Sequence, residues 1–492
     1  MPNRFTKGAE YGILAKQNFL GCEPMVFSSL TFLLYFFPVV LALYFVKSGI
    51  RWRNGVLLAA SLFFYAWGEP TWILAMLASA LINYFCALAM QGKKGAARKT
   101  WLWIGAGSAL GLLFIFKYLS FFANAFLGIF SSAARSPVLE RPIGISFYTF
   151  QILTYTVDVY RGKQKTQPSF ARLLLYVSCF PQLIAGPIVH YGDISKEIAS
   201  RSVSPDDFSA GMKRFLVGLG KKVLVANVCA EIMNKLPLAG AASLSLGGAW
   251  YAAAIYTLQL YFDFSGYSDM AIGLGRMFGF HYKENFDHPY WSASVREFWR
   301  RWHISLGSFF REYVYIPLGG NREGKGRTIR NTLIVWGLTG LWHGANWTFI
   351  LWGLYYGALL TIDLIGGRKL TKALPGAVSR VLTLALVMVG WVIFYYPTLG
   401  QAFSHLGAMF GFGQGLMDEN ALGVIRTYSV LPVIYFLLSL PTGDWLKTLT
   451  ARMNLSPRVG EIAGALVMLA LAAYSVIFIE GLSSNPFIYF QF

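Results

Sequence analysis

The segment that decides the fold is Trp72–Ala89, which reads WILAMLASALINYFCALA and carries no charged residue. An α-helix needs about 20 mainly apolar residues to cross the hydrocarbon core of a bilayer. The segment therefore predicts a transmembrane helix, and similar apolar runs occur along most of the chain.

These runs predict an all-α integral membrane protein, a polytopic bundle of about 11 to 13 spans that includes re-entrant or broken helices. Several runs are too short to cross a membrane unaided, and broken helices are tolerated where protein or a cavity covers the backbone. Phe121–Phe130 is a further short run, which we interpret as interfacial or re-entrant. Besides Trp72–Ala89, the candidate spans are Leu30–Val46, Val56–Trp67, Trp101–Phe116, Ile145–Val159, Leu173–Val189, Phe215–Met233, Trp250–Phe264, Thr332–Trp342, Trp347–Ile365, Val381–Tyr396, Tyr428–Leu440 and Ile462–Ile479.

The composition agrees with this interpretation. Of the 492 residues, 55% are hydrophobic and 13% are charged, whereas a soluble domain carries about 25% charged residues. The chain also has 15 Trp and 27 Tyr, residue types that favour the membrane–water interface. We therefore expect one membrane bundle rather than several soluble domains.

The net charge of +19 comes largely from basic clusters between the apolar runs. Lys and Arg accumulate in short cytoplasmic loops of membrane proteins and set their orientation. Arg51 and Arg53 follow the first span and a second basic cluster follows the third, so both loops are predicted to be cytoplasmic and the chain to start outside. Basic cytoplasmic loops account for the positive charge, so no nucleic-acid partner is predicted.

No metal site is predicted. Cys22, Cys86, Cys179 and Cys229 lack metal-ligand spacing, and three of them lie in or beside apolar runs, as small buried residues do. The chain has no His-Glu-x-x-His motif, P-loop or Gly-x-Ser-x-Gly elbow, which argues against zinc proteases, nucleotidases and serine hydrolases.

Residues 1–24 differ from the rest of the chain. They mix charged and apolar residues and lack the apolar core of a signal peptide. The hydrophobic pattern begins at Met25, so we expect the functional domain to be residues 25–492. The first 24 residues are then a disordered extension or, as we favour, a stretch upstream of a true start at Met25.

Two carboxylates interrupt the apolar run around Gly266. A charge at the bilayer centre costs about 3 kcal/mol on insertion scales, so Asp263 and Asp269 are conspicuous. One interpretation is that they cap a helix break at Gly266, since Asp satisfies helix N-termini. The other is that they line a polar cavity or orient a histidine.

Two further polar clusters carry candidate chemistry. Arg300 and Arg301 lie between two tryptophans, where they either anchor an interface or bind phosphates through the planar guanidinium. His343 lies at the end of an apolar run and is followed by Gly344. It is either structural or a general base, because the histidine pKa lies near neutrality, and glycine lets backbone or substrate approach closely.

Six stretches, in order, resemble the bacterial membrane-bound O-acyltransferases. The resemblance is strongest to members that acetylate alginate or peptidoglycan, more distant to those that transfer D-alanine to teichoic acid, and runs from Met25 to the C-terminus. The stretches are Met25–Ser29, Arg141–Gln151, Phe180–Pro187, Tyr261–Asp269, Phe298–Leu306 and Leu341–Asn346.

The resemblance implies a helical bundle around a central tunnel, with His343 as the catalytic residue and His303 as a second essential histidine. It implies acyl-CoA, acetyl-CoA in the first instance, as a donor substrate rather than a bound cofactor. Arg300 and Arg301 would then hold its phosphates, and Asn346 would line the tunnel or assist the oxyanion.

The resemblance also implies a multi-pass protein of the bacterial inner membrane, surrounded by membrane lipid. It would hand the acyl group to an extracytoplasmic acyltransferase partner, which O-acylates a cell-surface or exported polysaccharide. The sequence determines neither the polymer nor the size of the acyl group.

The C-terminal tail ends in NPFIYFQF, and Tyr489 is its only hydroxyl beyond Ser484. One interpretation is an interfacial aromatic anchor. The other is an acyl relay, in which the phenol accepts the acyl group in the tunnel and presents it outside.

Two other functions stay open at this point. A multi-span transporter or flippase for a polysaccharide precursor would also have many spans and intramembrane polar residues, although no inverted repeat is visible. A scaffold of a polymer-export complex would make His343 dispensable.

Overall fold

The computed structural model describes residues 25–130, 139, 141–184, 186–236, 238, 244–367, 373–443 and 457–481. These residues form helices and the connections between them, without a strand. The predicted all-α class is confirmed. The segment 1–24 and the tail with Tyr489 lie outside the described residues, so the predictions for both are untested.

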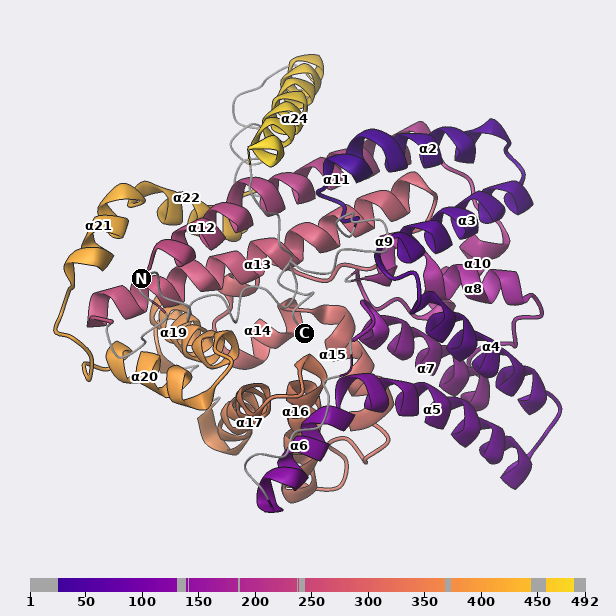
Figure 1. The fold of residues 1–492 in the computed structure, drawn as a ribbon, viewed down its shortest axis with the longest axis horizontal. Helices are drawn as coiled ribbons and strands as arrows, with labels where there is room; N and C mark the ends of the chain where they lie inside the picture. The colour runs from indigo at the N-terminus through magenta and orange to yellow at the C-terminus, as the bar shows by residue number, and fades with distance from the viewer. Residues whose placement is uncertain are drawn as a thin grey trace. The chain divides into compact units, whose positions relative to one another are not determined.

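The chain divides into two compact units. The first is built from Met1–Phe215 and Tyr267–Lys283, and the second from Leu216–Gly266 and Glu284–Ile488. Helices α11 and α13 each contribute residues to both units. Figure 1 shows the helices with their labels.

Helices in the first unit pack through small and polar residues. On α5, a Cβ atom at Gly105 would lie 2.9 Å from Asn83 Oδ1 of α4. The Thr156 hydroxyl of α7 donates to the same Asn83 oxygen at 2.8 Å, so three helices meet at one satisfied polar contact. The helices of this unit are η1 (Thr31–Phe36), α2 (Phe37–Val46), α3 (Ile50–Gly68), α4 (Ile73–Met90), α5 (Gly95–Lys117), α6 (Leu119–Phe130), α7 (Ile145–Arg161), α8 (Phe170–Ser178), α9 (Phe180–Leu183), α10 (Tyr191–Ala199) and most of α11 (Pro205–Gly220).

The second unit has an aromatic core and holds the candidate site. Buried Trp302, Trp352, Tyr356 and Trp391 pack together in this core. Its helices are η2 (Lys221–Ala226), α12 (Asn227–Lys235), most of α13 (Leu246–Met277), η4 (Pro289–Trp291), α14 (Val295–Arg301), α15 (Ile304–Phe310), η5 (Arg311–Tyr315), α16 (Lys325–His343), α17 (Trp347–Ile362), η6 (Asp363–Gly367), α19 (Gly376–Tyr395), α20 (Leu399–Met409), α21 (Glu419–Thr427), α22 (Val430–Ser439) and α24 (Pro457–Glu480).

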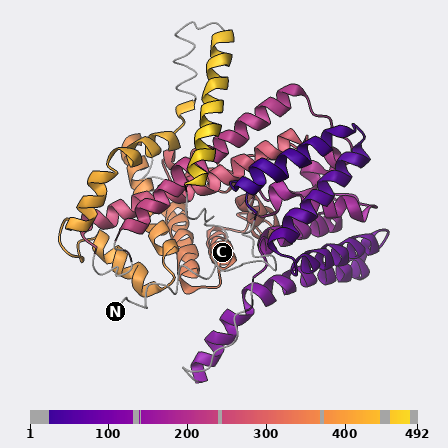
Figure 2. The same cartoon turned by 45° about the horizontal axis from the view of Figure 1, so that its top comes forward.

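Five helices of the described residues are long and apolar enough to cross a membrane. They are Ile73–Met90, Gly95–Lys117, Trp347–Gly367, Gly376–Tyr395 and Val459–Glu480. The bent pair α21 and α22, at 65°, raises the number to six if it forms one span. The other predicted spans lie in helices that do not pass this test of length and apolar composition. Leu30–Val46 is divided between η1 and α2, whereas Trp250–Phe264 lies within the 32-residue α13. The short run Phe121–Phe130, predicted to be interfacial or re-entrant, lies in α6, which follows α5 after a break at Tyr118 (Figure 2).

The predicted helix break at Gly266 is wrong. Helix α13 runs without interruption from Leu246 to Met277. Gly266 serves close packing instead, since a Cβ atom there would lie 2.8 Å from the Gly218 carbonyl oxygen. The two carboxylates therefore cap no helix end, and each pairs with a cation: Asp263 with Lys222 at 2.6 Å and Asp269 with Arg214 at 2.6 Å.

Candidate active site

His343 is positioned by a tight hairpin of α16 and α17. A Cβ atom at Gly340 would collide with the Phe349 carbonyl oxygen, and one at Gly353 would collide with the Trp336 carbonyl oxygen. Both glycines therefore let the two helix backbones meet. Helix α16 ends at His343, three residues beyond this crossing. The hairpin therefore places the imidazole against Trp352 in the second turn of α17.

The His343 ring lies in an aromatic box. Its centroid lies 4.9 Å from Trp342, 4.9 Å from Trp352 and 5.1 Å from Phe394, with steep interplanar angles. Only 6% of the residue is exposed. An imidazole held by ring edges and shielded from water has one orientation, as a general base requires.

His303 lies in the short connection between α14 and α15, outside the candidate spans. Its backbone has φ 46°, in the left-handed region that non-glycine residues seldom adopt. Phe264 of α13 packs edge-on against its ring at 4.6 Å. Burial lowers the pKa of His303 to about 3, so the ring is neutral at pH 7.

Asn285 fixes the tautomer of His303. Its Oδ1 atom accepts the Ser305 backbone N–H at 3.2 Å and the Ser305 hydroxyl at 2.9 Å, which identifies this atom as the oxygen. The same Oδ1 lies 3.2 Å from His303 Nδ1. An amide oxygen only accepts, so Nδ1 donates and Nε2 is the unprotonated nitrogen of the neutral ring.

Trp342 joins the two histidines. Its ring lies 6.0 Å from the His303 ring and 4.9 Å from the His343 ring. The structure thus brings together two residues separated by forty positions in the chain. Nothing in the sequence indicated that Asn285 belongs to this site. It lies in a polar loop, and only the folded chain brings it next to His303.

The two arginines have different surroundings. Arg301 forms ion pairs with Glu297 at 3.0 Å and with Asp287 at 3.4 Å. Arg300 is exposed, and no acidic group of the described residues lies within ion-pair distance of it. Arg300 is therefore the more available of the two for a phosphate group.

Asp263, Asp269 and Asn346 all have structural partners. Asp263 pairs with the buried Lys222, and Asp269, in the first unit, pairs with Arg214. Asn346 caps α17 by accepting the Thr348 N–H at 3.3 Å, and its amide group donates to the Pro397 carbonyl at 2.7 Å. Tunnel lining stays a prediction for these three residues.

The described residues thus form a helical protein with apolar membrane-span candidates, in which two buried histidines contact one aromatic cluster. The model of the membrane-bound O-acyltransferase family matches residues 159–399, which include both histidines. Curated relatives extend the match over nearly the whole chain. The chain belongs to this family and is an O-acyltransferase.

Several relatives are similar over most of their length. A probable alginate O-acetylase AlgI of Pseudomonas putida is 39% identical over 95% of this chain and 100% of its own length. A probable alginate O-acetylase AlgI of Pseudomonas aeruginosa is 42% identical over 80% of this chain and 76% of its own. A peptidoglycan O-acetyltransferase of Helicobacter pylori is 35% identical over 79% of this chain and 80% of its own.

Proposed function

We propose that residues 25–492 form an inner-membrane O-acyltransferase that moves an acetyl group from cytoplasmic acetyl-CoA to an exported or cell-surface polysaccharide. The observation that carries the proposal is the pair of buried histidines joined by Trp342. The names of the relatives, which acetylate alginate and peptidoglycan, support a polysaccharide as the final acceptor.

The chemistry needs one base and one proton donor, and His343 can serve as both. Its imidazole takes the proton from an acceptor hydroxyl, whose oxygen attacks the thioester carbonyl carbon. The tetrahedral intermediate collapses, the C–S bond breaks, and the leaving sulfur takes the proton from the imidazolium. His303, with Nε2 as its unprotonated nitrogen, orients the acceptor hydroxyl.

The indole N–H of Trp352 is a suitable donor for the oxyanion. Trp352 is 1% exposed, and its Nε1 atom has no hydrogen-bond partner among the described residues. Its ring contacts the His343 ring at 4.9 Å. A buried donor beside the base stabilises negative charge on the carbonyl oxygen, whereas the Asn346 amide is already engaged by Pro397.

Replacing Trp352 with phenylalanine removes this donor and keeps an aromatic ring in the cluster. We expect kcat for acetyl transfer to fall about 10²-fold with little change in KM, as for the loss of one oxyanion donor. The matched control is Trp336→Phe, an indole of the same cluster that packs against Trp352 and Tyr356. Equal kcat losses in the two variants would assign Trp352 a packing role only.

The proposed function is tested by measuring how much acetyl-CoA the protein consumes. The protein in inside-out membrane vesicles, supplied with radiolabelled acetyl-CoA, is expected to release coenzyme A and to transfer label when its extracytoplasmic acyltransferase partner and polymer are present. A variant with Arg300→Gln should show a raised KM for acetyl-CoA, because a phosphate contact is lost. Transport of a polysaccharide precursor without any release of coenzyme A would support the transporter alternative instead.

A further inference from the structure

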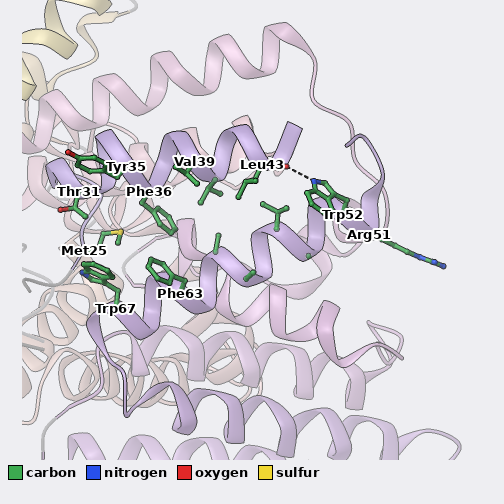
Figure 3. Close-up of a pocket in the computed structure, with 15 residues that line it drawn as sticks. Met25, Thr31, Tyr35, Phe36, Val39, Leu43, Arg51, Trp52, Phe63 and Trp67 are labelled. Atoms are coloured by element: carbon green, nitrogen blue, oxygen red, sulfur yellow. Dashed lines mark hydrogen bonds between the residues drawn. The ribbon is translucent and has the colours of Figure 1, made fainter. Parts of the chain in front are cut away.

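The first unit has an apolar groove on its surface. Its volume is about 840 Å³, and it lies between η1–α2 and α3 (Figure 3). Val39 and Leu43 form one wall and Phe63 contributes to the other (Figure 3). Ligand sites in proteins commonly have volumes of about 300–1,000 Å³, so the groove is large enough for a molecule rather than a single side chain.

Small residues of α3 make the floor of the groove. Gly55, Ala59 and Ala60 all line it. A Cβ atom at Gly55 would meet nothing within 4 Å. The wall residues Val39, Leu43 and Phe63 are 57%, 46% and 53% exposed, so the groove opens outward and would face the surrounding lipid in a membrane.

One end of the groove is closed and carries positive charge. Trp52 Nε1 donates to the Leu43 carbonyl at 2.8 Å and ties α2 to α3, as the dashed line in Figure 3 shows. Lys47 Nζ lies 5.1 Å from the Trp52 ring centroid, and Arg51 extends outward from this end (Figure 3). Among the described residues, no acidic group lies within ion-pair distance of Lys47 or Arg51.

The groove is longer than the hydrocarbon depth of one bilayer leaflet. It runs along α3 from Arg51 to Trp67, a rise of about 24 Å at ~1.5 Å per residue. The hydrocarbon core of one leaflet is about 15 Å deep, half of ~30 Å. A chain that starts at the basic end therefore stays within the groove as far as the bilayer centre.

We propose that this groove binds one acyl chain of an anionic phospholipid of the cytoplasmic leaflet, with the phosphate beside Lys47 and Arg51. The basic end suits a negative headgroup, and the predicted orientation places it at the cytoplasmic face, where anionic lipids attract basic residues. A peptide is a poorer occupant, because its backbone groups would find few hydrogen-bond partners between these apolar walls. The site is independent of the acyl-transfer proposal.

The test uses photoactivatable phosphatidylglycerol and phosphatidylcholine, each with a diazirine on one acyl chain, in nanodiscs that hold the full-length protein. We expect crosslinks to peptides of α2 and α3, with about tenfold higher yield from phosphatidylglycerol. Gly55→Phe fills the groove and should lower this yield about tenfold. Gly107→Phe, at an exposed α5 glycine that also has nothing within 4 Å of its Cβ position, is the matched control and should not change it.

A second variant tests the headgroup. The double variant Lys47→Gln with Arg51→Gln should keep the crosslinks. The crosslink yields from phosphatidylglycerol and phosphatidylcholine should then become about equal. Wild-type protein without crosslinks in the groove would overturn the proposal and indicate another occupant, such as residues 1–24 or a partner protein. Equal labelling by both lipids in the wild type, or unchanged labelling in Gly55→Phe, would also overturn it, since annular lipid would then suffice.

Discussion

His343→Ala is expected to reduce polymer acylation about 10²–10⁴-fold, the contribution of a positioned general base. The variant removes the imidazole that lies against Trp342, Trp352 and Phe394. Those three rings keep most of the local packing, so the protein should remain in the membrane at near wild-type abundance. Release of coenzyme A from acetyl-CoA and acetyl content of the polymer are the two measurements.

A matched control separates loss of the base from loss of a histidine in general. His281→Ala removes an imidazole whose side chain is 54% exposed and pairs with Glu197 in the first unit. That variant should acylate normally. Wild-type acylation by His343→Ala at equal abundance would show that His343 is structural and would favour the scaffold alternative.

Tyr489→Phe is expected to reduce polymer acylation to background if the C-terminal tail is an acyl relay rather than an interfacial anchor. The substitution removes one hydroxyl and keeps the aromatic ring, so an interfacial anchor would be preserved. A phenol with a pKa of about 10 is a better leaving group than an aliphatic alcohol. Its acetyl ester would therefore pass the acetyl group onward to a partner enzyme more readily than a serine ester.

The relay has a direct chemical readout. Protein incubated with acetyl-CoA in the absence of polymer should accumulate an O-acetylated peptide that contains Tyr489, and His343→Ala should not. Tyr474→Phe is the control, since it removes an exposed phenol from α24. Normal acylation by Tyr489→Phe would establish the tail as an anchor and leave the acceptor of the acetyl group to a different hydroxyl.

The sequence alone determined the class of the protein and its candidate chemistry. Long uncharged runs such as Trp72–Ala89 can satisfy their backbone groups inside a bilayer only as helices, so the all-α class followed from composition. His303 and His343 each lie in a short motif of polar and aromatic residues within or beside an apolar run. Both are buried, and both contact the ring of Trp342. Resemblance of those motifs identified the family before any contact was known.

Only the tertiary structure decided how the polar residues are used. The local sequence around Asp263 and Gly266 suggested a helix break, but α13 is continuous there. Lys222 of η2 forms an ion pair with Asp263, and the backbone at Gly218 packs closely against Gly266. The hydrogen bond from His303 to Asn285 and the ring contacts around Trp342 join positions far apart in the chain. Such contacts depend on how helices pack, and no local pattern of residues encodes them.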